Sequence, residues 1–219
     1  MVEISTSILS VQKEEITTKI YDLEVAHTDY FHIDVMDGKF VQNNTSDRMQ
    51  EFSETIKQIS NIPLDVHLMV EDVQKYVEEY IPLEPNIITF HYEAVKNKEE
   101  INELIKYIKD NNIKVGLSVK PSTNIEEIYE FLPYIHMVLV MTVEPGKGGQ
   151  QLMVDQLEKI KTLKSYINEK NIEIDIEADG GIKLENISEV KNSGVDIAVV
   201  GTGIIATEDY AKTIKELKI

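Results

Sequence analysis

The amino-acid sequence predicts an α/β fold, a closed (β/α)8 TIM barrel formed by a single domain over residues 1–219. Short apolar runs alternate with amphipathic, charge-rich segments along the whole chain, and no linker or low-complexity segment interrupts them. The alternation yields eight strand-then-helix units, which implies parallel strands joined by right-handed crossovers. An open, doubly wound sheet is the alternative, but the turn after the first strand lacks the GxGxxG pattern typical of that fold.

The predicted strands are short apolar runs bounded by polar or turn-forming residues. They cover residues 3–9, 30–36, 64–70, 86–92, 114–119, 137–143, 173–179 and 196–201. Because the carboxyl ends of barrel strands carry the functional residues, the last residues of each run are where a site is expected.

Helical patterns separate the strands, for example over residues 98–112 and 154–170. The first of these carries apolar residues at i, i+3, i+4 and i+7, which is the stripe of a helix packed on a sheet. These apolar residues are Ile101, Leu104, Ile105 and Ile108. A last helix is expected after residue 201, with Thr207 as its N-cap.

The composition excludes several classes of protein. A net charge of −17, from 39 acidic and 22 basic residues, disfavours binding to DNA or RNA. No apolar run approaches the roughly 18–20 residues of a membrane span. The start of the chain lacks the pattern of a signal peptide, and cysteine is absent, so we expect a protein of the reducing cytoplasm. An anionic substrate would need backbone N–H groups or a metal ion to balance its charge.

Ionisable side chains stand near the ends of three predicted strands: His32 and Asp34, then His67, then Asp179. Side chains two residues apart share one face of a strand, so inward-facing residues would meet at the barrel mouth. Two imidazoles and two carboxylates suit one divalent cation such as Zn, Mn or Fe(II). A single inward histidine is more often a hydrogen-bonded core residue, but four unpaired polar groups would cost several kcal/mol to bury.

Glycines cluster after the last three strands, in "EPGKGGQ" (144–150), "DGGI" (179–182) and "GTG" (201–203). Each cluster alone is typical of an ordinary turn. Together, in adjacent loops, they predict a nest of backbone N–H groups that binds a phosphate, as barrel enzymes often do after strands seven and eight. Such a site would let an acidic protein hold an anion.

Eight segments resemble, in order and spacing, the motifs of the ribulose-phosphate 3-epimerase family. They are "STSILS", "HIDVMDGKFV", "LDVHLMV", "TFHYEA", "VGLSVKPST", "VLVMTVEPGKGGQ", "IEADGGI" and "VVGTGI". The resemblance implies a barrel enzyme that interconverts D-ribulose 5-phosphate and D-xylulose 5-phosphate with one divalent metal cation. It implies a metal site of His32, Asp34, His67 and Asp179, in which Asp34 and Asp179 are also the catalytic acid and base. Its expected small-molecule partner is a sugar phosphate, and we expect a homo-oligomer.

The resemblance also implies residues that touch the substrate. Ser7 and His67 would do so near the metal, and Gly146, Lys147, Gly148, Gly149, Gly180, Gly181, Gly201 and Thr202 would surround the phosphate. We expect Met36, Met69 and Met141 to line the pocket or the core, since thioethers fill irregular gaps.

Epimerisation next to a carbonyl removes a proton from one face of a carbon and returns one to the other face. Strands two and seven are three places apart in a ring of eight, so Asp34 and Asp179 could flank a planar enediolate. An Asp with a pKa near ~3.9 is a weak base, and a metal acting as a Lewis acid would stabilise the enediolate. Glu177 is expected to point inward, either to orient a ligand histidine or as a structural hydrogen-bonding group. His91 is expected to be structural or to support a ligand.

The chain departs from the usual family pattern at Thr6, Gln42, Lys147 and Thr202-Gly203, and in "NNTSDRM" (43–49). These changes leave open a sister epimerase acting on a longer ketose phosphate such as D-allulose 6-phosphate. A non-catalytic sugar-phosphate-binding barrel is a third reading, which the retention of both aspartates and both histidines argues against. A metal-free decarboxylase would need a D-x-K-x-x-D pattern, and "DVMDGK" does not supply it.

Overall fold

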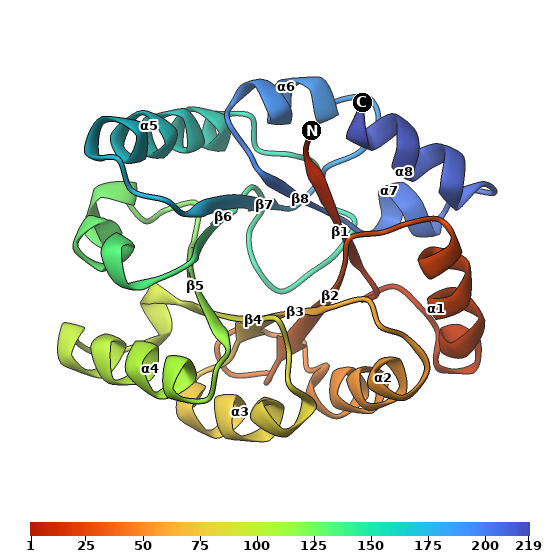
Figure 1. Cartoon of the computed structure of the whole chain (residues 1–219), viewed down its shortest axis with the longest axis horizontal. Helices are drawn as coiled ribbons and strands as arrows, with labels where there is room; N and C mark the ends of the chain where they lie inside the picture. Colours follow the sequence, from red (N-terminus) through yellow and green to blue (C-terminus); the bar gives the residue numbers. More distant parts are fainter.

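A closed ring of parallel strands in the order β1-β2-β3-β4-β5-β6-β7-β8 forms the centre of the computed structural model, which describes residues 1–219 (Figure 1). The strands are β1 (Glu3–Ser7), β2 (Tyr30–Met36), β3 (Leu64–Met69), β4 (Ile87–His91), β5 (Lys114–Val119), β6 (Met137–Met141), β7 (Asp175–Asp179) and β8 (Ile197–Val200). The predicted barrel is confirmed. Six of the strands are one or two residues shorter than predicted, because the apolar runs extend beyond the paired residues, and two have the predicted bounds.

Helices surround the ring on its outside (Figure 1). The α-helices are α1 (Ile16–Val25), α2 (Ser46–Ile59), α3 (Val73–Tyr80), α4 (Lys98–Asp110), α5 (Asp155–Lys170), α6 (Ile187–Asn192), α7 (Thr202–Ile205) and α8 (Tyr210–Lys218). Short 3-10 helices add η1 (Lys13–Glu15), η2 (Ile81–Leu83) and η3 (Tyr92–Ala94), and a longer one, η4 (Ile125–Tyr134), forms the crossover from β5 to β6. None of the helices combines the length and the apolar composition that a membrane crossing requires.

The amphipathic pattern of the helices is confirmed, but the predicted N-cap of the last helix is wrong. The four apolar residues predicted on α4 are all buried against the sheet. Helix α8 is capped by Asp209, whose side chain accepts a hydrogen bond from the backbone N–H of Lys212. Thr207 instead donates its hydroxyl hydrogen to the carbonyl oxygen of Ile204, at the end of α7. Residues 206–209 therefore form a turn after α7, and α8 begins later than expected, at Tyr210.

The main hydrophobic core lies between the strands and the helices, where 54 buried residues form one cluster. The outward residues of β2 show why: Phe31, Ile33 and Val35 join this cluster. His32 and Asp34 alternate with them and point into the ring. The barrel interior is thus partly polar, and buried polar groups of this kind need partners.

Candidate metal and substrate site

The four predicted ligand residues meet inside the barrel at the carboxyl ends of their strands. In the parallel ladder between β2 and β3, Asp34 lies opposite His67. Asp179 is the last residue of β7, on the far side of β1 and β8. One nitrogen or oxygen atom from each of His32, Asp34, His67 and Asp179 lies within 4.8 Å of the others. The prediction that these four side chains point into the barrel is therefore confirmed.

The distances between the four facing atoms fit a divalent cation. His32 Nε2 lies 3.5 Å from Asp34 Oδ1 and 3.7 Å from Asp179 Oδ2. His67 Nδ1 lies 3.8 Å from Asp34 Oδ1 and 3.4 Å from Asp179 Oδ2. Ligand atoms ~2.1 Å from a tetrahedral metal are ~3.4 Å apart, which is close to these separations. Both nitrogens are buried without a hydrogen-bond partner, so this donor set suits a metal of the Zn, Mn or Fe(II) kind.

The charges of the cluster shift the pKa values of its members. Burial would raise the pKa of Asp34, but its interactions with His32 and His67 are stronger together and hold that pKa below its usual value. Burial would lower the pKa of His32, but the charges of Asp65 and Asp34 raise it well above its usual value. The pKa of His67 is also raised, because its interactions with the nearby carboxylates of Asp179 and Asp34 outweigh its burial. The two imidazoles therefore favour the ionised form of Asp34.

Asp65 is a member of the site that the sequence analysis missed. It lies opposite His32 in the β2–β3 ladder, and its Oδ2 accepts hydrogen bonds from His32 Nδ1 (2.6 Å) and from Ser5 Oγ (2.7 Å). This pairing turns His32 Nε2 toward the ligand cluster. Asp65 is two residues before His67, so strand alternation could have placed it on the inner face.

Both expectations for Glu177 are wrong: it neither orients a predicted ligand histidine nor makes a structural hydrogen bond. The orienting role belongs to Asp65, whereas both carboxylate oxygens of the buried Glu177 lack a hydrogen-bond partner. Burial, together with the charge of the neighbouring Asp65, raises the pKa of Glu177 well above its usual value. This shift favours the protonated form of Glu177, whereas the charge of His32 lowers the pKa of Asp65 despite its burial.

The second ligand histidine is supported by His91, at the end of β4. His67 Nε2 lies 3.0 Å from His91 Nε2, and His91 Nδ1 lies 3.1 Å from Glu93 Oε2. Burial lowers the pKa of His91 to about 4, so its ring is neutral and can share one hydrogen with His67. Because this contact uses Nε2 of His67, its Nδ1 is left facing Asp34 and Asp179. His91 thus has the supporting position that was one of the expectations for it.

A cavity of about 660 Å³ opens above the cluster at the same end of the barrel. Asp34 and Asp179 form part of its wall, with 7% and 14% of their side chains exposed, whereas His32 and His67 are fully buried behind them. The other predicted residues on the wall are Ser7, Met36, Met69, Met141, Gly146, Lys147, Gly148, Gly149, Gly180, Gly181, Gly201 and Thr202. All predicted substrate-binding residues except His67 therefore share one cavity.

Ser7 and the methionines have distinct places in this cavity. Ser7 Oγ donates a hydrogen bond of 2.7 Å to Asp34 Oδ2, so it fixes the carboxylate while Oδ1 faces the two histidines. Met36 and Met69 form a small buried cluster with Val41, and Met141 belongs to the apolar interior beneath β6. These thioethers give the floor of the cavity an apolar lining.

The glycine loops need glycine at two positions where the backbone is crowded. Gly181 has a φ of +70°, and a Cβ added there would lie 2.3 Å from the backbone nitrogen of Leu152. Gly146 has a φ of +106°, and its carbonyl oxygen accepts a hydrogen bond of 2.7 Å from Asn43 Nδ2. The loop after β6 is thereby joined to the loop after β2 across the cavity.

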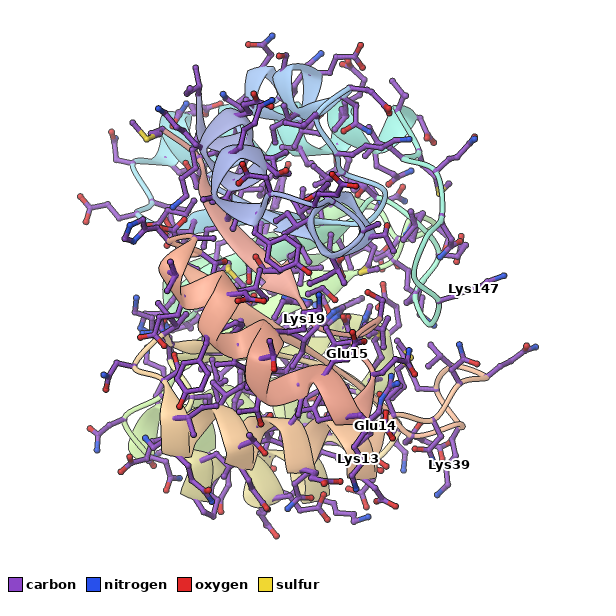
Figure 2. The ribbon with its side chains drawn as sticks, turned by 90° about the vertical axis from the view of Figure 1, so that its right-hand side faces the viewer. Lys13, Glu14, Glu15, Lys19, Lys39 and Lys147 are labelled. Atoms are coloured by element: carbon purple, nitrogen blue, oxygen red, sulfur yellow. The ribbon has the colours of Figure 1, made fainter.

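Lys147 stands at the rim of the cavity and is exposed. Figure 2 shows Lys147 and Lys39 on two loops at the same end of the molecule, with their side chains directed into solvent. Lys39 lies in a turn with Asp37 and Gly38, in which Asp37 Oδ1 accepts hydrogen bonds from the backbone N–H groups of Lys39 and Phe40.

Comparison with known proteins shows the same family that the motifs indicate. Residues 3–205 match the model of the ribulose-phosphate 3 epimerase family. The chain is 36% identical over 216 residues to ribulose-phosphate 3-epimerase of Helicobacter pylori strain J99, covering 99% of this chain and 96% of that protein. It is 33% identical over 219 residues to the Bacillus subtilis strain 168 protein of the same name, covering 100% and 99%.

Solved structures share the fold at much lower identity. A crystal structure of 3-hexulose-6-phosphate synthase superposes with a TM-score of 0.73 at 14% identity, covering 99% of this chain and 98% of that chain. At this identity the likeness shows the barrel fold alone. The family match and the two relatives carry the assignment: the chain belongs to the ribulose-phosphate 3-epimerase family.

Proposed function

We propose that this chain interconverts D-ribulose 5-phosphate and D-xylulose 5-phosphate by inverting the configuration at C3. One observation carries the proposal: two carboxylates on the wall of a cavity converge with two imidazoles buried behind them, in a chain of this family. The relatives in Helicobacter pylori and Bacillus subtilis are named for this epimerisation. Three glycine loops on the same wall support a phosphorylated substrate.

Asp34 and Asp179 are the acid and base of this reaction. Asp34 takes the hydrogen of C3 as a proton from one face, and Asp179 returns a proton to the opposite face; the reverse reaction exchanges their roles. Their strands stand three places apart in the closed ring, which allows the two carboxylates to flank one carbon. Ser7 holds Asp34 in place during the transfer.

His32, Asp34, His67 and Asp179 would hold one divalent cation, which we propose to be Zn, Mn or Fe(II). When bound, such a cation supplies positive charge next to the substrate oxygen that becomes negative as the proton leaves C3. The apolar floor formed by Met36, Met69 and Met141 excludes water from the reacting carbon.

Exchange of hydrogen at C3 in deuterated water tests the proposed function. Metal-loaded protein is incubated with D-ribulose 5-phosphate or with D-allulose 6-phosphate, and deuterium at C3 is followed by NMR. We expect exchange and epimerisation of the pentulose phosphate. If only D-allulose 6-phosphate exchanged, the hexulose phosphate would be the substrate in place of the pentulose phosphate. If neither exchanged, the result would favour a binding protein without catalysis.

Replacement of Asp65 by asparagine is expected to weaken metal binding by about 10- to 100-fold, because the charged acceptor that orients His32 becomes neutral. Titration with metal in the presence of a competing chelator measures the change, and thermal unfolding reports the fold. Asp175→Asn is the matched control, since Asp175 is an exposed aspartate at the opposite end of a barrel strand. Unchanged metal affinity in a folded Asp65→Asn protein would contradict the role given to Asp65.

We also propose that the enzyme acts in the cytoplasm as a homo-oligomer. Tyr21 and Val25, four residues apart on α1, have exposed fractions of 51% and 75%, and such an apolar pair suits contact with a second copy. The absence of cysteine suits a reducing compartment. Light scattering after size exclusion is expected to give a mass of two or more chains of 25.0 kDa each. The mass of a single chain would contradict the proposal.

A further inference from the structure

Arg48 is the only arginine of the chain, and it lies on the wall of the substrate cavity. It stands in the first turn of α2 and is half-buried. The chain carries 39 acidic residues, yet the one hydrogen bond of the Arg48 side chain goes to an uncharged acceptor, the carbonyl oxygen of Leu9. A guanidinium without a carboxylate partner is unusual in so acidic a protein, and it leaves a full positive charge facing the cavity.

The guanidinium group is held in place from two sides. Its NH2 donates to the Leu9 carbonyl oxygen at 3.0 Å, and its Cζ lies 5.9 Å from the centre of the Phe52 ring. Leu9 lies beside the glycine loop after β6: both line the cavity, and a Cβ added to Gly148 would lie 3.5 Å from Leu9 Cδ2. The segment that fixes Arg48 is therefore close to the loop predicted to surround the phosphate.

The charges of the cavity wall explain what Arg48 is needed for. Asp34, Glu144 and Asp179 line the cavity, and the only cations among the lining residues are Arg48 and Lys147. The side chain of Lys147 points into solvent (Figure 2). Backbone N–H groups can bind phosphate oxygens but carry no full charge. A phosphate dianion that enters beside three carboxylates is therefore balanced on the wall chiefly by Arg48.

We propose that Arg48 binds the phosphate group of the substrate and sets the preference of this enzyme for phosphorylated over unphosphorylated ketoses. The inference rests on the proposed function and adds a residue to it. Guanidinium has five N–H donors in a planar fork, and only one hydrogen bond is made to Leu9, so further donors can reach two phosphate oxygens. Such charge-assisted bonds are stronger than those of neutral donors.

The test compares Arg48→Met with the unmodified, metal-loaded enzyme on two substrates, by C3 exchange in deuterated water. We expect kcat/KM for D-ribulose 5-phosphate to fall about 10- to 100-fold, mainly through KM, while exchange of unphosphorylated D-ribulose stays unchanged. The inhibition constant of inorganic phosphate is expected to rise by a similar factor. Arg48→Lys keeps the positive charge but loses the planar fork of donors. Its kcat/KM for D-ribulose 5-phosphate is therefore expected to lie between those of Arg48→Met and the unmodified enzyme.

Lys39→Met is the control for loss of a cation at this end of the barrel, because Lys39 is exposed on the loop after β2 and does not line the main cavity. Equal slowing of both ketoses in Arg48→Met would mean that Arg48 only holds Leu9, and it would overturn the proposal, as would unchanged kinetics. If the unmodified enzyme exchanged neither substrate, the proposed function would fail instead. Calorimetry with inorganic phosphate would then still decide: weaker binding to Arg48→Met supports the role, and equal binding refutes it.

Discussion

Replacement of Asp34 by asparagine is expected to lower the rate of epimerisation by at least about 10³-fold while the barrel stays folded. Asparagine cannot accept the C3 proton, and it offers a neutral oxygen in place of the Oδ1 that faces His32 and His67. The amide can still accept the hydrogen bond of Ser7, so the local structure is retained. Exchange at C3 in deuterated water measures the loss, and circular dichroism with thermal unfolding measures the fold.

Asp47→Asn is the matched control for this experiment. Asp47 is an exposed aspartate in the first turn of α2 and is not part of the cavity wall, so its replacement is expected to leave the rate unchanged. A folded Asp34→Asn protein with a near-normal rate would remove Asp34 from the proton transfer. Loss of rate in both variants would point to a general effect of charge on the substrate.

The fold and the meeting of His32, Asp34, His67 and Asp179 could be predicted because both follow from periodicities within single elements. Alternation along β2 places His32 and Asp34 on one face, and the apolar stripe of α4 places its packing surface. The motif resemblance then supplied the roles. Segment ends were less accurate: the backbone N–H of Thr142 still donates to the carbonyl oxygen of Asp179 on β7, but Thr142 and Val143, the last two residues of the predicted strand, lie in a bend after β6.

Asp65 and Arg48 could not be assigned from sequence because their roles depend on register between distant segments. Asp65 meets His32 only because β3 pairs with β2 in one particular register. Arg48 faces the cavity only because the first turn of α2 docks against Leu9, 39 residues earlier. Thr207 and Asp209 show the same limit locally: both are good N-cap residues two positions apart, and the packing of α7 decides between them.

Removal of the divalent cation is expected to reduce the rate to the level of the Asp34→Asn variant, and addition of Zn, Mn or Fe(II) is expected to restore it. Asp34 is a weak base for a carbon-bound hydrogen, because its two histidine neighbours hold its pKa below its usual value despite its burial. Proton removal therefore depends on the positive charge that the cation would supply to the substrate oxygen, and this charge is lost on chelation. The experiment uses dialysis against a chelator, metal analysis and C3 exchange. Mg or Ca, which prefer six or more oxygen ligands, are expected to restore less activity than metals that accept nitrogen.

Thermal unfolding provides a readout of the same site that does not depend on catalysis. A ligand that binds only the folded protein stabilises it by about 2.7 kcal/mol at 100 times its Kd, so chelation is expected to lower the Tm and metal to restore it. In the Asp34→Asn variant the metal-dependent rise in Tm should be smaller, because one of the four ligands is altered. An enzyme that keeps its full rate and Tm after its metal content has fallen to zero would show that His32, Asp34, His67 and Asp179 meet for another reason, and the two aspartates would then have to invert C3 on their own.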